Sequence, residues 1–105
     1  MKYLAVLITT GSMDEGKAIA SALVEQRLAA CVNLIPSIQS TYWWEGKIET
    51  SEEVLLVAKT EESRFPAFTD AVKRLHSYDV PEIIALPIEA GHMPYLRWVT
   101  ESLRR

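Results

Sequence analysis

The stretch from Leu28 to Thr60, LAACVNLIPSIQSTYWWEGKIETSEEVLLVAKT, decides how the rest of this 105-residue chain is arranged. Its β-branched and aromatic residues alternate at period two around Ser40, a pattern that is typical of a strand. Gly46 lies between two such runs and predicts a turn that joins them into a hairpin. Pro36 cannot donate to a strand ladder, so it predicts an edge position or a bulge in the outgoing strand.

The predicted hairpin is long for a chain of this size. An arm of roughly 15 residues at about 3.3 Å each spans near 50 Å, whereas a compact domain of this length has a diameter of roughly 33 Å. We therefore expect the hairpin to overhang its domain and to contact other subunits. A bent hairpin that folds back over its own core is the alternative. The aromatic residues expected at the subunit interface, where such residues are enriched, are Tyr42, Trp43, Trp44 and Trp98.

Segments on either side of the hairpin complete the pattern of strands and helices. Residues 3–8 and 82–88 are apolar runs that predict two further strands. Residues 13–27 predict a helix that starts with the capping-box spacing of Ser12 and Glu15. A stripe from Phe65 to Leu75 predicts a second helix with Ser63 as its N-cap. Pro94 predicts the start of a tail helix, and we expect its buried stripe to be Tyr95, Leu96, Val99 and Leu103.

The order strand, helix, strand, strand, helix, strand predicts one α+β domain over residues 1–105 with the ferredoxin-like, split βαβ fold. Right-handed crossovers place both helices on one face of the antiparallel sheet. The other face needs a cover, because residues 3–8 are apolar on both sides. A partner subunit would supply that cover.

Composition excludes several classes of function. The net charge is −3 and no basic tract is present, so nucleic acid is not an expected partner. The single cysteine, Cys31, excludes an intrachain disulfide and any Cys-x-x-Cys motif. The apolar run at residues 3–8 is too short for a signal-peptide core, and no run approaches transmembrane length. We therefore expect a cytoplasmic protein without a membrane partner.

Five motifs occur in an order and spacing that match a known family. They are LAACVN at 28–33, YWWEGKI at 42–48, KT at 59–60, HSYDVPEI at 76–83 and YLRW at 95–98. With these motifs the chain resembles the CutA divalent-cation tolerance proteins over essentially its whole length. The resemblance implies a ferredoxin-like protomer, a homotrimer and a link to copper tolerance. It also implies a fold similar to the PII signalling proteins, which bind small ligands in clefts between subunits.

Copper or another divalent cation is the expected cofactor. Cys31 offers a soft sulfur ligand, and His76 or His92 could add an imidazole. We expect metal ligands among Cys31, His76, Asp79 and Glu82, with the first two able to meet across a subunit boundary. The alternatives are a small buried cysteine and a histidine that caps a helix end.

A second hypothesis is a small-molecule sensor of the PII type. Lys59, Tyr78 and Glu82 flank buried strands and are expected to converge, with Asp79, on a ligand cleft between subunits. The alternative for these groups is a structural ion-pair network. No nucleophile, base and orienter set is legible, so no catalytic residue is expected. An enzyme that uses Lys59, His76, Tyr78 and Glu82 is the weakest of the three interpretations.

Overall fold

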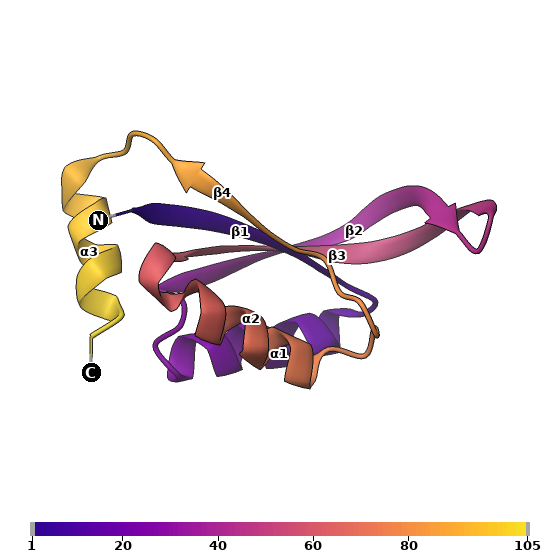
Figure 1. The fold of residues 1–105 in the computed structure, drawn as a ribbon, viewed down its shortest axis with the longest axis horizontal. Helices are drawn as coiled ribbons and strands as arrows, with labels where there is room; N and C mark the ends of the chain where they lie inside the picture. The colour runs from indigo at the N-terminus through magenta and orange to yellow at the C-terminus, as the bar shows by residue number, and fades with distance from the viewer. Residues whose placement is uncertain (1, 105) are drawn as a thin grey trace.

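A four-stranded antiparallel sheet forms the centre of the computed structural model, which describes residues 2–104 (Figure 1). Helices α1 and α2 lie side by side on one face of this sheet, and α3 lies at one end (Figure 1). The strand order β2-β3-β1-β4 confirms the predicted ferredoxin-like fold. The elements are β1 Tyr3–Thr10, α1 Met13–Glu25, β2 Cys31–Trp44, β3 Lys47–Glu61, α2 Phe65–Leu75, β4 Ile83–Ile88 and α3 Met93–Ser102.

The core lies between the sheet and the pair α1 and α2. Alternate residues of β1, among them Val6 and Ile8, point toward the helices and are fully buried. Leu23 of α1 and Phe68 of α2 meet them from the other side, and both are fully buried as well. Each such side chain stabilises the fold by about 1.5–3 kcal/mol relative to an exposed one. The packing of this single layer therefore holds α1 and α2 in place.

The opposite face of the sheet is apolar but is left largely open within this chain. Ile35 of β2 is 45% exposed, and Ile84 and Leu86 of β4 are 49% and 47% exposed. Leu7 and Val57, between them on the central strands, are half-buried. We call this surface the open face. Residues 3–8 were expected to be covered on both faces. Within residues 2–104 only the face toward α1 and α2 is covered.

The β2–β3 hairpin extends well beyond the helices (Figure 1). Its strands pair from Cys31 and Lys59 at the base to Trp44 and Lys47 at the tip. The molecule is consequently elongated, with extents of 44 × 26 × 22 Å. The overhang is confirmed, and the alternative of a hairpin folded over its own core is wrong. Trp43 and Trp44 at the tip are 73% and 60% exposed.

Two local irregularities shape this hairpin. The turn residues Glu45 and Gly46 have φ angles of 49° and 80°, the pair of positive values that a tight type I′ turn requires. A bulge interrupts the register between Ile35 and Ile38, where Ser37 has a φ of 61°. Because β2 is an edge strand, the prediction that Pro36 marks an edge or a bulge is confirmed on both counts.

Helix α1 ends at Glu25, two residues before the predicted end at Arg27. The Leu28 N–H donates to the Leu23 carbonyl at 2.9 Å, and the Arg27 N–H donates to the Val24 carbonyl at 3.1 Å. These two bonds form a Schellman motif, in which the residue after the C-cap takes a left-handed conformation. Arg27 occupies that position with a φ of 60°. The helix stops there although no glycine is present to signal it.

Helix α2 also begins later than predicted. Glu61 still pairs with Tyr3 in the sheet, so β3 continues through it, and a 3₁₀ turn follows at residues 62–64. The helix proper starts at Phe65, and its N-cap residue, Arg64, makes no side-chain capping bond. Ser63 therefore does not cap this helix. Pro66 lies in the first turn, where a proline is tolerated.

The tail helix α3 is fastened at its C-terminal end by two arginines. Arg27 donates to the Ser102 carbonyl at 2.9 Å, and Arg64 donates to the Leu103 carbonyl at 2.6 Å. Positive charge at this end also suits the helix dipole. Tyr95 is 42% exposed and does not join the buried stripe as expected. Its ring instead packs in a tilted arrangement against that of Trp98, which is itself 44% exposed.

The hairpin turn yields a first prediction. Gly46→Ala should destabilise the protein by about 1 kcal/mol, because a left-handed φ strains a residue with a Cβ. No atom lies within 4 Å of the position where that Cβ would stand, so backbone strain is the only expected effect. Glu45→Asn is the matched variant and should be neutral or stabilising, since Asn tolerates this conformation. Equal denaturation midpoints for Gly46→Ala and the natural protein would contradict the assigned turn.

Candidate functional site

An acidic cleft opens where the hairpin leaves the body of the molecule. It has a volume of about 830 Å³ and lies between the hairpin and residues 77–82. Four of its lining residues carry carboxylates, and none of the lining residues that the structure describes is basic. This charge favours a cation over an anion. The residues that line it are Thr9, Ser40, Thr41, Tyr42, Trp44, Glu49, Glu53, Ser77, Tyr78, Asp79, Val80 and Glu82.

Glu53 is the buried carboxylate of this cleft, with 8% of its surface exposed. The Tyr78 hydroxyl donates to its Oε2 atom at 2.7 Å. Burial, together with the hydrogen bond to Glu53 and its negative charge, raises the pKa of Tyr78 to about 12. The phenol therefore stays protonated at neutral pH and donates its hydrogen bond to Glu53. Its stabilising effect is present below the ordinary pKa of 10.0 and is lost as the pH rises through about 12.

His76 connects the end of α2 to this cleft. Its side chain is fully buried. Nδ1 accepts a hydrogen bond from the Tyr78 backbone N–H at 3.0 Å, and Nε2 lies 2.7 Å from the Thr9 carbonyl oxygen. A ring that accepts at Nδ1 and donates from Nε2 to a carbonyl is the neutral, Nε2-protonated form. Both ring nitrogens are thus engaged by backbone groups.

Glu15 holds the same segment from the side of α1. The Glu15 N–H donates to Ser12 Oγ at 3.2 Å, which is half of the predicted capping box. Its carboxylate accepts the Ser77 N–H at 2.7 Å and lies 3.5 Å from His76 Nδ1. Burial alone would raise the pKa of Glu15, but the hydrogen bonds that its carboxylate accepts from Ser77 and Gly11 outweigh this effect and lower the pKa. Glu15 is therefore ionised and anchors Ser77.

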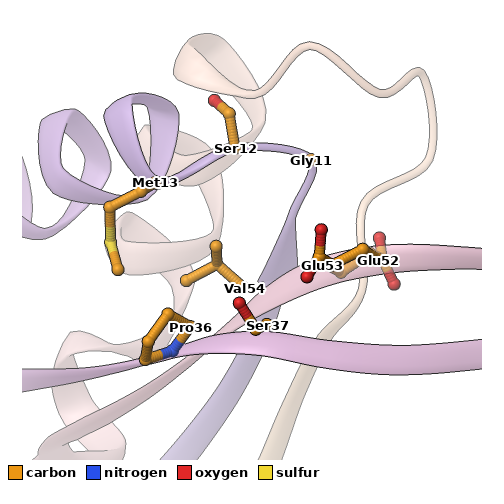
Figure 2. Close-up of a pocket in the computed structure, with 8 residues that line it drawn as sticks. All are labelled: Gly11, Ser12, Met13, Pro36, Ser37, Glu52, Glu53 and Val54. Carbon is orange, nitrogen blue, oxygen red and sulfur yellow. The ribbon is translucent and has the colours of Figure 1, made fainter.

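A second, smaller pocket of about 190 Å³ lies beside the cleft, and Glu53 lines both (Figure 2). It is bounded by the start of α1, the bulge of β2 and the neighbouring part of β3 (Figure 2). Figure 2 shows the Met13 side chain extending toward Pro36 across this space. Met13 thus lies beside the bulge as a packing residue. The residues that line this pocket are Gly11, Ser12, Met13, Pro36, Ser37, Glu52, Glu53 and Val54.

Cys31 lies at the other end of the sheet from His76. It pairs with Lys59, which pairs with Ala5 of β1, whereas His76 contacts Thr9 of the same strand. Four residues of strand separate these two points, a distance of about 13 Å. One chain therefore does not bring Cys31 and His76 together. A site with both would need two copies, and metal ligation by either residue stays a prediction.

Cys31 contacts the tyrosine of helix α3. Its Sγ atom lies 3.4 Å from the Tyr95 hydroxyl. The hydrogen bond to Cys31, followed by burial, raises the pKa of Tyr95 to about 12. Lys59, beside Cys31, donates to the Asn33 side-chain oxygen. Lys59 lies six residues from Glu53 along β3, so it would join the cleft only across a subunit boundary.

The expected ligands Asp79 and Glu82 do line the acidic cleft, together with Tyr78. Within residues 2–104, however, no three His, Cys, Asp or Glu side chains stand close enough to hold a metal ion. Tyr42 and Trp44, expected at an interface, line the cleft as well. The sequence did not predict Glu49, Glu53 and Glu15 as residues of this site. The acidic residues of the hairpin gave a charge signal, but only the fold turns Glu53 inward.

Comparison with known proteins identifies the family. The model of the CutA1 divalent ion tolerance protein family matches residues 4–102. The chain belongs to this family. The human Protein CutA is 54% identical over 102 residues, which cover 94% of this chain and 57% of the human protein. The divalent-cation tolerance protein CutA of Thermus thermophilus is 50% identical over 97 residues, covering 92% of this chain and 94% of that protein.

Solved CutA1 structures share the fold. The crystal structure of CutA1 from Oryza sativa has a TM-score of 0.96 at 47% identity, covering 99% of this chain and 95% of that one. The curated rice relative is named chloroplastic, and this chain spans 57% of its length. The structure from Archaeoglobus fulgidus is titled periplasmic. No helix within residues 2–104 is long and apolar enough to cross a membrane. A cytoplasmic location stays a prediction.

The contact between Tyr78 and Glu53 yields a second prediction. Glu53→Gln should lower the pKa of Tyr78 from about 12 toward 10.0, because the charge that opposes phenolate formation is removed. Burial should keep the value above 10.0. Ultraviolet absorbance of tyrosinate during an alkaline titration measures this shift. Glu52→Gln, an exposed neighbour outside this bond, is the control. An equal shift in both variants would contradict the specific contact.

Proposed function

We propose that this CutA1 family chain works as a homotrimer that binds a divalent cation at the acidic cleft. The observation that carries the cation is the set of Glu49, Glu53, Asp79 and Glu82, which line the cleft without any basic residue among its described walls. The observation that supports assembly is the apolar open face. The number of three subunits rests on the family resemblance.

Assembly would cover the surfaces that one chain leaves bare. The open face presents Ile35, Ile84 and Leu86 to solvent, and large exposed apolar surfaces usually mark interfaces. Tyr42 is 41% exposed beside the two exposed tip tryptophans. An obligate interface of this kind buries more than about 2,000 Å² in total. Hairpins that reach across to neighbours would place Trp43, Trp44 and Trp98 in subunit contacts.

Sedimentation equilibrium tests the assembly. At micromolar concentration the mass should be three times the 11.9 kDa of one chain. A three-subunit closed ring is expected to persist on dilution, since an obligate interface leaves no stable folded monomer. A folded monomer at this concentration would rule out the proposed assembly.

Truncation of the hairpin tip tests which residues hold the subunits together. Trp44→Ala should weaken assembly by about 2 kcal/mol or more, as interface hot spots do. Trp43→Ala is expected to act in the same direction, with the secondary structure of the protomer retained until dilution. Val24→Ala on the helical side is the control, since Val24 is also partly exposed, at 42%. Tryptophan variants that assemble as tightly as Val24→Ala would show that the tip lies outside the interface.

The cation would be attracted chiefly by carboxylate oxygens, no three of which stand close enough among residues 2–104 to ligate it together. Asp79 and Glu82 come from the segment before β4, and Glu49 comes from the hairpin. Oxygen ligands suit hard divalent ions, and copper heads the divalent affinity series at most sites. The alternative is a copper site in which Cys31 adds a soft sulfur ligand to the carboxylates. It would need Cys31 from one copy near the cleft of another.

A small-molecule sensor is the second candidate function. The cleft falls within the 300–1,000 Å³ that small-molecule pockets occupy. Tyr42, Trp44 and Tyr78 give it aromatic walls that could cover a planar group. Lys59 would supply a positive charge only from a neighbouring subunit. An enzyme built on Lys59, His76, Tyr78 and Glu82 has less support, since Lys59 stands apart and the relatives are named as tolerance proteins.

Titration of the assembled protein with Cu(II) and with Mn(II) tests the cation site. Asp79→Asn and Glu82→Gln should each weaken binding about tenfold or more, because each removes one charged ligand. Glu89→Gln, an exposed carboxylate outside the cleft, is the matched control and should bind as the natural protein does. Loss of Cu(II) binding in Cys31→Ser alone would favour the sulfur-containing site. Equal binding by Asp79→Asn, Glu82→Gln and Glu89→Gln would overturn the acidic-cleft site.

A further inference from the structure

The contacts of His76 suit a residue that holds the wall of the cleft in place better than they suit a metal ligand. A metal binds an imidazole nitrogen through a free lone pair. In His76, Nε2 directs its proton at the Thr9 carbonyl, and the lone pair of Nδ1 accepts the Tyr78 N–H. Neither nitrogen therefore offers a lone pair to the cleft. The side chain is also fully buried, so it presents no atom to a bound molecule.

The contacts of His76 join three parts of the molecule. Thr9 belongs to β1, Tyr78 belongs to the wall of the cleft, and His76 itself ends α2. The rings of His76 and Tyr78 lie 4.6 Å apart at an interplanar angle of 50°, so the imidazole also supports the phenol ring. That phenol donates to the buried Glu53. A continuous chain of contacts thus runs from β1 through His76 to Glu53 of β3.

We propose that His76 is the positioning residue of the acidic cleft. As a neutral, Nε2-protonated imidazole it fixes the Tyr78 backbone against β1 and thereby holds the Tyr78 phenol over Glu53. The placement of Asp79 and Glu82, which follow Tyr78 along the same wall, depends on this anchor. The proposal rests on the proposed function only for its effect on cation binding. The anchoring itself is measured without any cation.

Besides Tyr78, the Glu15 carboxylate lies close to the His76 imidazole. Glu15 of α1 places Oε2 3.5 Å from Nδ1, and Tyr78 brings its N–H and its phenol. Strand β1 contributes the Thr9 carbonyl. The Glu15 carboxylate already accepts the Ser77 N–H, so it anchors the preceding residue independently. Removal of the imidazole acceptor should therefore loosen Tyr78 more than Ser77.

Two amide variants distinguish the role of Nδ1 from the role of Nε2. His76→Asn places an acceptor oxygen near the position of Nδ1, whereas His76→Gln places a donor nitrogen near the position of Nε2. Backbone amide exchange of Tyr78 should become about tenfold faster in His76→Gln and stay near the natural rate in His76→Asn. The loss of one hydrogen bond changes an opening equilibrium by about this factor. Ser77 serves as the internal reference. Equal exchange of Tyr78 in both variants would overturn the proposal.

The natural protein provides a test that needs no variant to fold. Nitrogen NMR of the His76 ring should show the proton on Nε2 at neutral pH, and a proton on Nδ1 would overturn the proposal. Titration with Mn(II) then links the anchor to the cleft: His76→Gln should bind more weakly than His76→Asn. If the natural protein binds no cation, the proposed function fails while the exchange and NMR results still decide the role of His76. Equal loss of binding in both variants, with Tyr78 exchange unchanged, would identify His76 as a ligand.

Discussion

The pairing of β3 with β1 on one side and β2 on the other determines where the hairpin and the acidic cleft lie. Residues 54–61 of this strand pair with β1, whereas residues 47–59 take part in the pairing with β2. Because β1 ends at Thr10, opposite Val54, the outer part of β3 has only one neighbour. The hairpin must therefore leave the body of the molecule at that point. Glu53 is the first residue beyond it.

The acidic cleft follows from this step in the sheet. Where β1 stops, the segment after α2 fills the corner and brings Tyr78 over Glu53. A carboxylate at such a corner is shielded on one side by the sheet and on the other by the phenol. His76 and Glu15 hold that segment from two directions, through the Tyr78 and Ser77 amides. The cleft is thus a product of strand lengths as much as of its own side chains.

The outline of the fold could be predicted because its signals are local. The period-two pattern around Ser40, Gly46 at the turn and Pro36 at the edge each have a direct physical meaning, and each prediction is confirmed. Errors arose where tertiary contacts override local preference. Glu61 pairs with Tyr3, and this pairing keeps the chain in the sheet past the predicted helix start. Helix α1 stops early, at Glu25, and the left-handed residue that follows its C-cap is Arg27 rather than a glycine.

The candidate site was less predictable, because it depends on register. Asp79 and Glu82 were found from their place before a strand, and they do line the cleft. The pairing of Cys31 with Lys59 and Ala5 puts the cysteine about 13 Å along β1 from the His76 contact. The spacing of these residues in the sequence does not predict this separation, which depends on the strand register. Alternation places Glu53 on the face of β3 opposite Val54 and Leu56, and its burial depends on the contact with Tyr78, which the sequence does not predict.

We infer that copies of this chain cover the open face. Hydroxyl-radical footprinting of the protein in solution tests this inference by comparing apolar side chains that a single chain exposes to a similar degree. Ile35, Ile84 and Leu86 are 45–49% exposed on the open face, and Val24 and Leu75 are 42% and 46% exposed on the helical side. The first three should be protected while the last two are oxidised. Equal oxidation of both sets would contradict the claim.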